Sequence, residues 1–129
     1  MDRVVHFQMP YDNKDRMAKF YETVFGWHNQ FLGPEMGEYV LATTTESCAD
    51  GTPKRPGAIN GGFFANPPER QHTSIVIEVS DISESMLKVT ASGGKVLCDP
   101  MEIPGVGKMA SFKDTEGNQV TMMQFTMKR

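Results

Sequence analysis

The sequence is low in cysteine, has no long apolar run and carries no strong charge of either sign. Cys48 and Cys98 are its two cysteines, and their wide separation excludes a compact metal or redox motif. No apolar stretch reaches the roughly 20 residues that span a bilayer, and the first residues lack the pattern of a secretory signal. The formal net charge of −3 indicates neither nucleic acid nor a membrane as partner. We therefore expect a cytoplasmic protein with free thiols.

What is present is a strand followed by a helix, and this pattern occurs twice. His6 lies on the first strand and Gly26 ends the first helix, whereas Ser74 lies on the second strand and Gly94 ends the second helix. Both intervals are 20 residues (26 − 6 and 94 − 74). The chain therefore repeats one structural plan, and its equivalent positions carry different side chains.

In the first half, residues 4–9 alternate between two faces, with Val5, Phe7 and Met9 on one and His6 and Gln8 on the other. Asp12 or Asn13 caps the helix, whose predicted apolar stripe is Met17, Phe20, Tyr21 and Val24.

Three further strands are predicted in this half, at 27–31, 38–44 and 58–64, with a polar exposed loop at 45–57. Adjacent Gly61 and Gly62 inside the last strand indicate a bulge, a bend or a close approach by backbone or ligand.

The second half repeats the plan after a linker at 65–71. Asp81 or Ser83 caps its helix, and strands follow at 95–103, 107–113 and 118–125. The order βαβββ, found twice, predicts an α+β fold with helices on one face of the sheets. We expect one domain of residues 1–129, made of modules 1–65 and 72–129.

The sequence Phe20-Tyr21-Glu22-Thr23-Val24-Phe25-Gly26-Trp27 resembles the vicinal oxygen chelate superfamily, and so does the second half. There the resemblance rests on four segments: Val79-Ser80-Asp81-Ile82, Gly93-Gly94-Lys95-Val96, Ile103-Pro104-Gly105-Val106-Gly107 and Asp114-Thr115-Glu116-Gly117-Asn118. Members include glyoxalase I, extradiol dioxygenases and the bleomycin resistance proteins. The resemblance covers essentially the whole chain, and it implies curved sheets that form a cup, and a homodimer.

In metal-using relatives, ligands project into the cup from the first and last strands of each half. Carried over position by position, this resemblance offers His6, then Asn60 or Gly61, then Ser74 and Thr121. Serine and threonine hydroxyls bind Zn²⁺, Ni²⁺ or Fe²⁺ weakly, because these ions prefer imidazole, carboxylate or thiolate ligands. We therefore expect no metal and no other cofactor.

His6 is the candidate catalytic residue, either as a hydrogen-bond partner or as a general base, and the alternative is a structural histidine. The candidate ligand-binding residues are Tyr39, Asn60, Ser74, Met109 and Thr121. His72 is expected to be exposed at the entry of its strand, and Cys98 to lie within a strand.

The leading hypothesis is a metal-independent, glyoxalase-like protein that binds or transforms a small organic molecule in the cup. Whether it is an enzyme stays open. One alternative is a metal-dependent lyase, isomerase or dioxygenase. The other is a sequestering protein of the bleomycin-resistance kind, with an aromatic groove that includes Trp27, Phe63 and Tyr39.

Overall fold

The computed structural model describes residues 1–67 and 72–126, and the chain divides into two compact units. The His6 unit comprises His6–Thr73, and the Ser74 unit comprises Ser74–Arg129 together with Met1–Val5. The linker predicted at 65–71 and the end of the predicted second module lie partly outside the described residues. No helix in the described ranges is long and apolar enough to cross a membrane.

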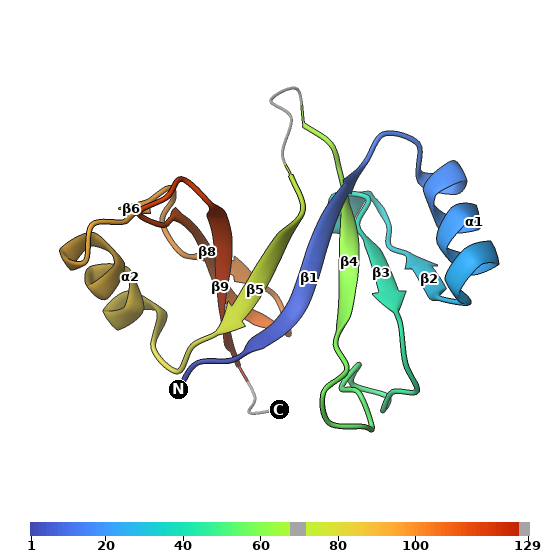
Figure 1. Ribbon diagram of the computed structural model, residues 1–129, viewed down its shortest axis with the longest axis horizontal. Helices are drawn as coiled ribbons and strands as arrows, with labels where there is room; N and C mark the ends of the chain where they lie inside the picture. Colours follow the sequence, from blue (N-terminus) through green and yellow to red (C-terminus); the bar gives the residue numbers. More distant parts are fainter. Residues whose placement is uncertain (68–71, 127–129) are drawn as a thin grey trace. The chain divides into compact units, whose positions relative to one another are not determined.

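The His6 unit is one helix packed against one face of a mixed sheet (Figure 1). Its elements are β1 (Val4–Tyr11, which begins in the other unit), α1 (Lys14–Phe25), β2 (His28–Phe31), the short 3-10 helix η1 (Pro34–Met36), β3 (Val40–Thr43) and β4 (Asn60–Ala65). The strand order is β2-β3-β4-β1, in which β1 runs parallel to β4 and the other pairs are antiparallel.

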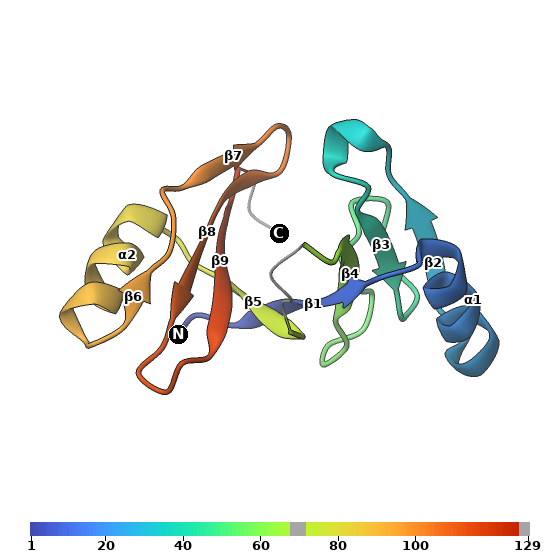
Figure 2. The same ribbon diagram turned by 90° about the horizontal axis from the view of Figure 1, so that it is seen from above.

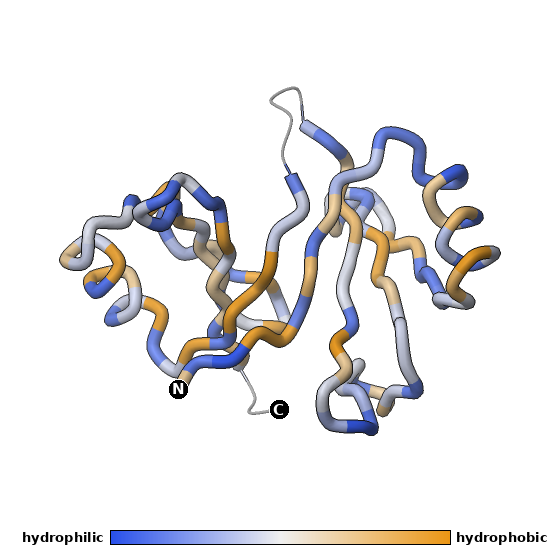
Figure 3. The backbone as a smooth tube through the Cα atoms, viewed as in Figure 1, coloured by the Kyte–Doolittle hydropathy of each residue, from blue (hydrophilic) through white to orange (hydrophobic). Residues whose placement is uncertain are grey.

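Helix α1 begins and ends where the sequence predicts. The side chain of Asn13, one of the two predicted caps, accepts a hydrogen bond from the Arg16 backbone N–H at 2.9 Å. Gly26 stops the helix in the left-handed conformation, at φ 73°. Hydrophobic and hydrophilic segments alternate along α1, as an amphipathic helix requires (Figure 3).

The apolar stripe predicted for α1 is partly wrong. Met17 and Tyr21 pack into the core, but Phe20 and Val24 are 54% and 55% exposed. Ala18 is buried instead, which means that the face of α1 against the sheet is rotated relative to the prediction. The small Ala18 side chain lets the helix approach the strands closely.

The core of the His6 unit is aromatic, and it includes two residues of the groove predicted from the sequence. Val40, Ala42 and Phe63 are buried, and the residues packed against them are Phe7, Met9, Tyr11, Met17, Tyr21 and Trp27. The Trp27 ring centroid lies 5.4 Å from that of Phe7 and 6.4 Å from that of Phe63. Phe63 is fully buried, whereas Trp27 is half-buried and packs against it from the edge of this core.

The Ser74 unit repeats the arrangement, with α2 against its own sheet (Figure 2). Its elements are β5 (Ser74–Glu78), α2 (Ile82–Ala91), β6 (Lys95–Val96), β7 (Met101–Ile103), β8 (Gly107–Lys113) and β9 (Gln119–Phe125). The strand order is β5-β9-β8-β6, and β7 also pairs with β8. Asp81 caps α2 by accepting from the Glu84 backbone N–H at 3.1 Å. Its core consists of Val79, Ile82, Ala110 and Met122.

The strand predicted at 95–103 is two strands, β6 and β7, separated by residues 97–100, which include Cys98 and Pro100. Proline has no backbone N–H to donate to a neighbouring strand, so the pairing with β8 is interrupted there. Cys98 is therefore exposed in the break, not enclosed in a strand as predicted. The α+β class with two repeated strand-helix-strand modules is confirmed.

Candidate functional site

His6 and Gln8 lie on the face of β1 that is turned away from α1. Phe7 and Met9 pack into the core on the helix side, and successive residues of a strand point to opposite faces. In the register of the sheet, His6 pairs with Asn60, and Gln8 pairs with Gly62. We call this side of the sheet the His6 face. Leu41 also belongs to it, because it pairs with Gly62 from the other side.

Tyr39 directly precedes β3, and its ring lies across Gly62 on the His6 face. A Cβ atom added to Gly62 would overlap the Tyr39 hydroxyl and ring. A Cβ atom added to Gly61 would overlap the Phe7 ring, which belongs to the core on the opposite face. The two adjacent glycines therefore make room for two aromatic rings on opposite sides of β4.

The hydroxyl of Tyr39 is hydrogen bonded to His6, with 3.1 Å between Tyr39 Oη and His6 Nε2. Both side chains are half-buried. Burial raises the pKa of Tyr39 to about 12, and a hydrogen bond with the Gln8 side chain acts in the opposite direction. The phenol is therefore neutral throughout the physiological range.

A strained turn holds Tyr39 in this place. Glu38 has a φ of 58°, in the left-handed region that residues with a side chain rarely adopt, and it follows Gly37 in the same region. The Tyr11 hydroxyl donates to the Glu38 carbonyl at 2.7 Å, and Lys14 Nζ lies 3.0 Å from the Glu38 carboxylate. These contacts, made by β1 and α1, fix the backbone immediately before Tyr39.

Asn60 is buried beside His6. Both the oxygen and the nitrogen of its side-chain amide are hydrogen bonded to the loop between β3 and β4. Its Oδ1 accepts from the Thr44 backbone N–H at 2.8 Å, while its Nδ2 donates to Ser47 Oγ at 2.8 Å and to the Gly51 carbonyl at 3.0 Å. Asn60 thus holds the loop in the structure, and a role in binding a ligand stays a prediction.

The remaining candidates lie in the Ser74 unit, on the side of its sheet turned away from α2. Thr121 pairs with Val76, and its hydroxyl lies 3.4 Å from that of Ser111. Met109 and Met123 are opposite each other on β8 and β9. Ser74 begins β5 two residues before Val76 and therefore shares this side. We call it the Ser74 face.

Sequence reasoning assigned no role to Gln8, which contacts Tyr39, or to Ser111, which contacts Thr121. Gln8 lies two residues after His6, so its position on the same face was available as a signal. Ser111 has no such signal, because only the pairing of β8 with β9 brings it to Thr121. His72 is exposed before β5, as predicted.

The residues at the expected metal positions do not fit a divalent transition metal. His6 is the one imidazole, the Asn60 oxygen already accepts the Thr44 N–H, and Ser74 and Thr121 contribute neutral hydroxyls. Within the described residues, no group of three or more His, Cys, Asp or Glu side chains is placed to hold an ion.

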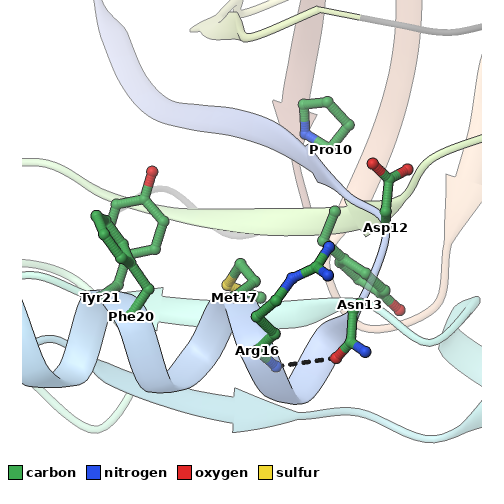
Figure 4. Close-up of a pocket in the computed structure, with 8 residues that line it drawn as sticks. Pro10, Asp12, Asn13, Arg16, Met17, Phe20 and Tyr21 are labelled. Carbon is green, nitrogen blue, oxygen red and sulfur yellow. Dashed lines mark hydrogen bonds between the residues drawn. The ribbon is translucent and has the colours of Figure 1, made fainter.

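Each unit also has an open pocket beside its helix, and neither is lined by a candidate residue. The pocket of the His6 unit has a volume of about 340 Å³, with Asn13 and Arg16 at one end and Phe20 and Tyr21 at the other (Figure 4). The pocket of the Ser74 unit, of about 270 Å³, lies over Val89 and Phe112. Both pockets are on the helix side, so the His6 face and its chemistry are separate from them.

Comparison with known proteins shows which family this chain is similar to. Residues 3–122 match the family model of the Glyoxalase/Bleomycin resistance protein/Dioxygenase superfamily. A glyoxylase-like domain-containing protein of Didymella fabae is 32% identical over 116 residues, which are 86% of this chain and 84% of that protein. The CFP32 protein of Mycobacterium bovis is 28% identical over 109 residues, which are 82% of this chain and 38% of that longer protein.

Solved structures agree on the fold. A methylmalonyl-CoA epimerase superimposes with a TM-score of 0.69 at 16% identity, covering 96% of this chain and 95% of that one. Another, in complex with methylmalonyl-CoA and NH4+, gives 0.68 at 15% identity and covers 98% and 96%. The chain belongs to the Glyoxalase/Bleomycin resistance protein/Dioxygenase superfamily.

Proposed function

We propose that this protein is a metal-independent, glyoxalase-like protein that binds a small organic molecule at the His6 face and transfers a proton to or from it. The observation that carries the proposal is the contact of 3.1 Å between His6 Nε2 and Tyr39 Oη. An imidazole titrates near neutral pH, and a neutral phenol can donate and accept a proton at once. Together they are a proton-transfer pair that needs no metal.

The side chains around this pair favour an uncharged ligand. The described positions of β3 and β4 that share this face include Thr43 and Phe64 besides the residues named above, and none of them is Asp, Glu, Lys or Arg. An anionic ligand would find no fixed cation here to compensate its charge. We therefore propose an enolisable carbonyl compound without a charged group at its reacting end, whose enolate charge is balanced by protonated His6.

The two alternatives are less well supported. A metal-dependent lyase or dioxygenase needs a set of ligands that the expected positions do not supply. A sequestering protein was expected to use Trp27, Phe63 and Tyr39, of which Trp27 and Phe63 pack in the core. The small-molecule partner and the homodimer implied by the resemblance remain parts of the present proposal.

Exchange of carbon-bound hydrogen for deuterium tests the proposal directly. The protein, dialysed against a chelator, is incubated in D₂O with dihydroxyacetone, methylglyoxal and the hemithioacetal of methylglyoxal with glutathione, and the loss of C–H signals is followed by NMR. We expect accelerated exchange for at least one of these. His6→Asn is expected to slow it by at least about 100-fold, the usual contribution of a general base.

His28→Asn is the matched control, because His28 is an exposed histidine of the same unit, on β2. Exchange that appears only after nickel or zinc is added would establish the metal-dependent alternative. Thermal stabilisation by one of these compounds, without exchange and equally in His6→Asn, would instead indicate binding elsewhere.

A further inference from the structure

Three methionines lie side by side in one row across the sheet of the Ser74 unit. Met101 on β7 is the register partner of Met109 on β8, and Met109 is in turn the register partner of Met123 on β9. Residues directly opposite each other point to the same side of a sheet, so all three belong to the Ser74 face. We call them the methionine row. Met101 is 60% exposed, whereas Met109 and Met123 are half-buried.

Packing of the core does not explain the methionine row. The core of this unit lies on the helix side of the sheet, where Met122 is buried and Met86 packs against it. The row is on the opposite side of the same sheet, and most of the surface of Met101 is in contact with solvent. An apolar side chain that stays exposed gains little from the hydrophobic effect. Packing therefore accounts for Met86 and Met122, but not for the position of Met101 at the end of the row.

The spacing of the row suits a metal ion between neighbouring sulfur atoms. Adjacent strands lie about 4.8 Å apart, and the Cβ atoms of opposite residues lie at about the same distance. With a metal–sulfur bond of about 2.3 Å, as zinc sites show, two sulfur atoms on either side of one ion are about 4.6 Å apart. Met109 is central, and the unbranched side chains of Met101 and Met123 have three rotatable bonds each, which let them lean towards it. The row can therefore present its thioethers to one ion.

The chemistry of the thioether decides which kind of ion fits. Thioethers are soft, uncharged ligands, and they favour Cu⁺ over the divalent ions that prefer imidazole, carboxylate or water. The next position along the row is Glu78 on β5, the register partner of Met123. Its carboxylate is paired with Arg3, at 3.2 Å between Arg3 Nε and Glu78 Oε1, and a carboxylate is in any case a poor ligand for a soft ion. The donors of the row are therefore its three sulfur atoms.

We propose that the methionine row is a binding site for a soft monovalent metal ion such as Cu⁺, with the sulfur atoms of Met101, Met109 and Met123 as ligands. The proposal goes beyond the proposed function and does not depend on it, because the row lies outside the His6 face. It also concerns positions other than those at which the resemblance places divalent metals. Met101 belongs to β7, at the edge of the sheet, and its exposure gives the ion a path to the row.

Titration with Ag⁺, a soft monovalent ion that is not oxidised in air, tests the proposal. The background carries Cys48→Ser and Cys98→Ser, because both thiols are exposed and would also bind Ag⁺. In protein labelled with ¹³C at the methionine methyl groups, we expect Ag⁺ to shift three of the ten signals, those of the methionine row.

Replacement of each row residue by leucine measures its share in the affinity. Met101→Leu, Met109→Leu and Met123→Leu are each expected to weaken Ag⁺ binding at least about 10-fold in calorimetry, since the loss of a residue that merely supports a metal ligand often has this effect. Met36→Leu is the matched control, because Met36 is 41% exposed and lies in the other unit. Its affinity should equal that of the background.

The dependence of binding on pH distinguishes thioethers from the other ligands of this chain. A thioether has no proton to lose, so the affinity for Ag⁺ should be the same at about pH 5.5 and pH 7.5. Imidazole must be deprotonated to bind a metal, and its affinity falls in acid. A fall of 10-fold or more at the lower pH would place the ion on a histidine and overturn the proposal.

Two further outcomes would contradict the methionine row as a site. One is a shift spread evenly over the exposed methionines, and the other is an affinity as high in the three row variants as in Met36→Leu. Leucine for methionine keeps the side-chain volume, so the variants should fold, and thermal unfolding checks this. Should one variant fail to fold, the methyl shifts of the background protein still decide the question. Cu⁺, kept reduced with ascorbate, should bind the same set of variants in the same order, and a failure to bind would exclude copper as the ion.

Discussion

The two units share one plan, but the sides of their sheets turned away from the helices carry different chemistry. The first strand of one unit contributes His6, in contact with Tyr39, whereas the equivalent strand of the other contributes Ser74. The Ser74 face presents the Ser111 and Thr121 hydroxyls beside methionines. A repeated fold therefore gives two equivalent surfaces, and the hydrogen-bonded imidazole and phenol of His6 and Tyr39 lie on the His6 face.

The largest expected difference between the units concerns their two buried polar residues, Asn60 and Thr121. Asn60→Ala leaves the Thr44 N–H and the Ser47 and Gly51 oxygens without their partner. At about 1 kcal/mol for each hydrogen bond, we expect a loss of about 3 kcal/mol in the free energy of unfolding. Urea denaturation followed by circular dichroism measures it.

Thr121→Val is the counterpart in the Ser74 unit, since it removes the hydroxyl with little change of shape. We expect a loss of about 1 kcal/mol, because the contact with Ser111 is long, at 3.4 Å. Equal losses in the two variants would show that Asn60 does not hold its loop through these hydrogen bonds.

The next effect concerns the space that Gly62 leaves for Tyr39. Gly62→Ala forces the Tyr39 ring away, and we expect a destabilisation of about 2 kcal/mol, as overpacking usually costs. The displaced phenol should also titrate nearer its ordinary value, which ultraviolet absorbance measures. In Gly62→Ala combined with Tyr39→Ala, the cost should be less than the sum of the two single variants.

Gly61→Ala is the control for this prediction. It overlaps Phe7 on the core side, so it should destabilise the protein and leave the titration of Tyr39 in place. A titration of Tyr39 that moves equally in both glycine variants would contradict the assignment of one ring to each glycine.

The smallest effect is a dependence of stability on pH at the alkaline end. The pKa of Tyr39 is about 12 in the folded protein and about 10 for an unfolded tyrosine. Above pH 10 the unfolded chain loses this proton first, so stability falls as the pH rises towards 12, whereas below pH 10 the contribution is fully present. At pH 11 the loss is about 1 kcal/mol relative to pH 9, and Tyr39→Phe should not show it. Urea denaturation of both proteins at the two pH values decides this.

Much of the fold follows from local sequence signals. Asn13 and Gly26 delimit α1, and strand β8 has the predicted bounds, because capping residues and alternation act over a few neighbours. The break between β6 and β7 was missed although Pro100 marks it. The rotation of α1, which exposes Phe20, was also missed, because which of several apolar residues faces the sheet depends on packing.

In the candidate site, too, local features could be predicted from the sequence, whereas contacts made by packing could not. By itself, the sequence determined the repeat, the family and the place of His6 and Gln8 on one face of β1, since strand parity and capping are properties of adjacent residues. Only the tertiary structure decided that Tyr39 lies across Gly62 and reaches His6, 33 residues away in the chain. That contact depends on a left-handed turn at Glu38, held by Tyr11 and Lys14, and on a glycine in another strand. Contacts assembled from four separate segments leave no local pattern, because each residue type is common and only the packing brings them together.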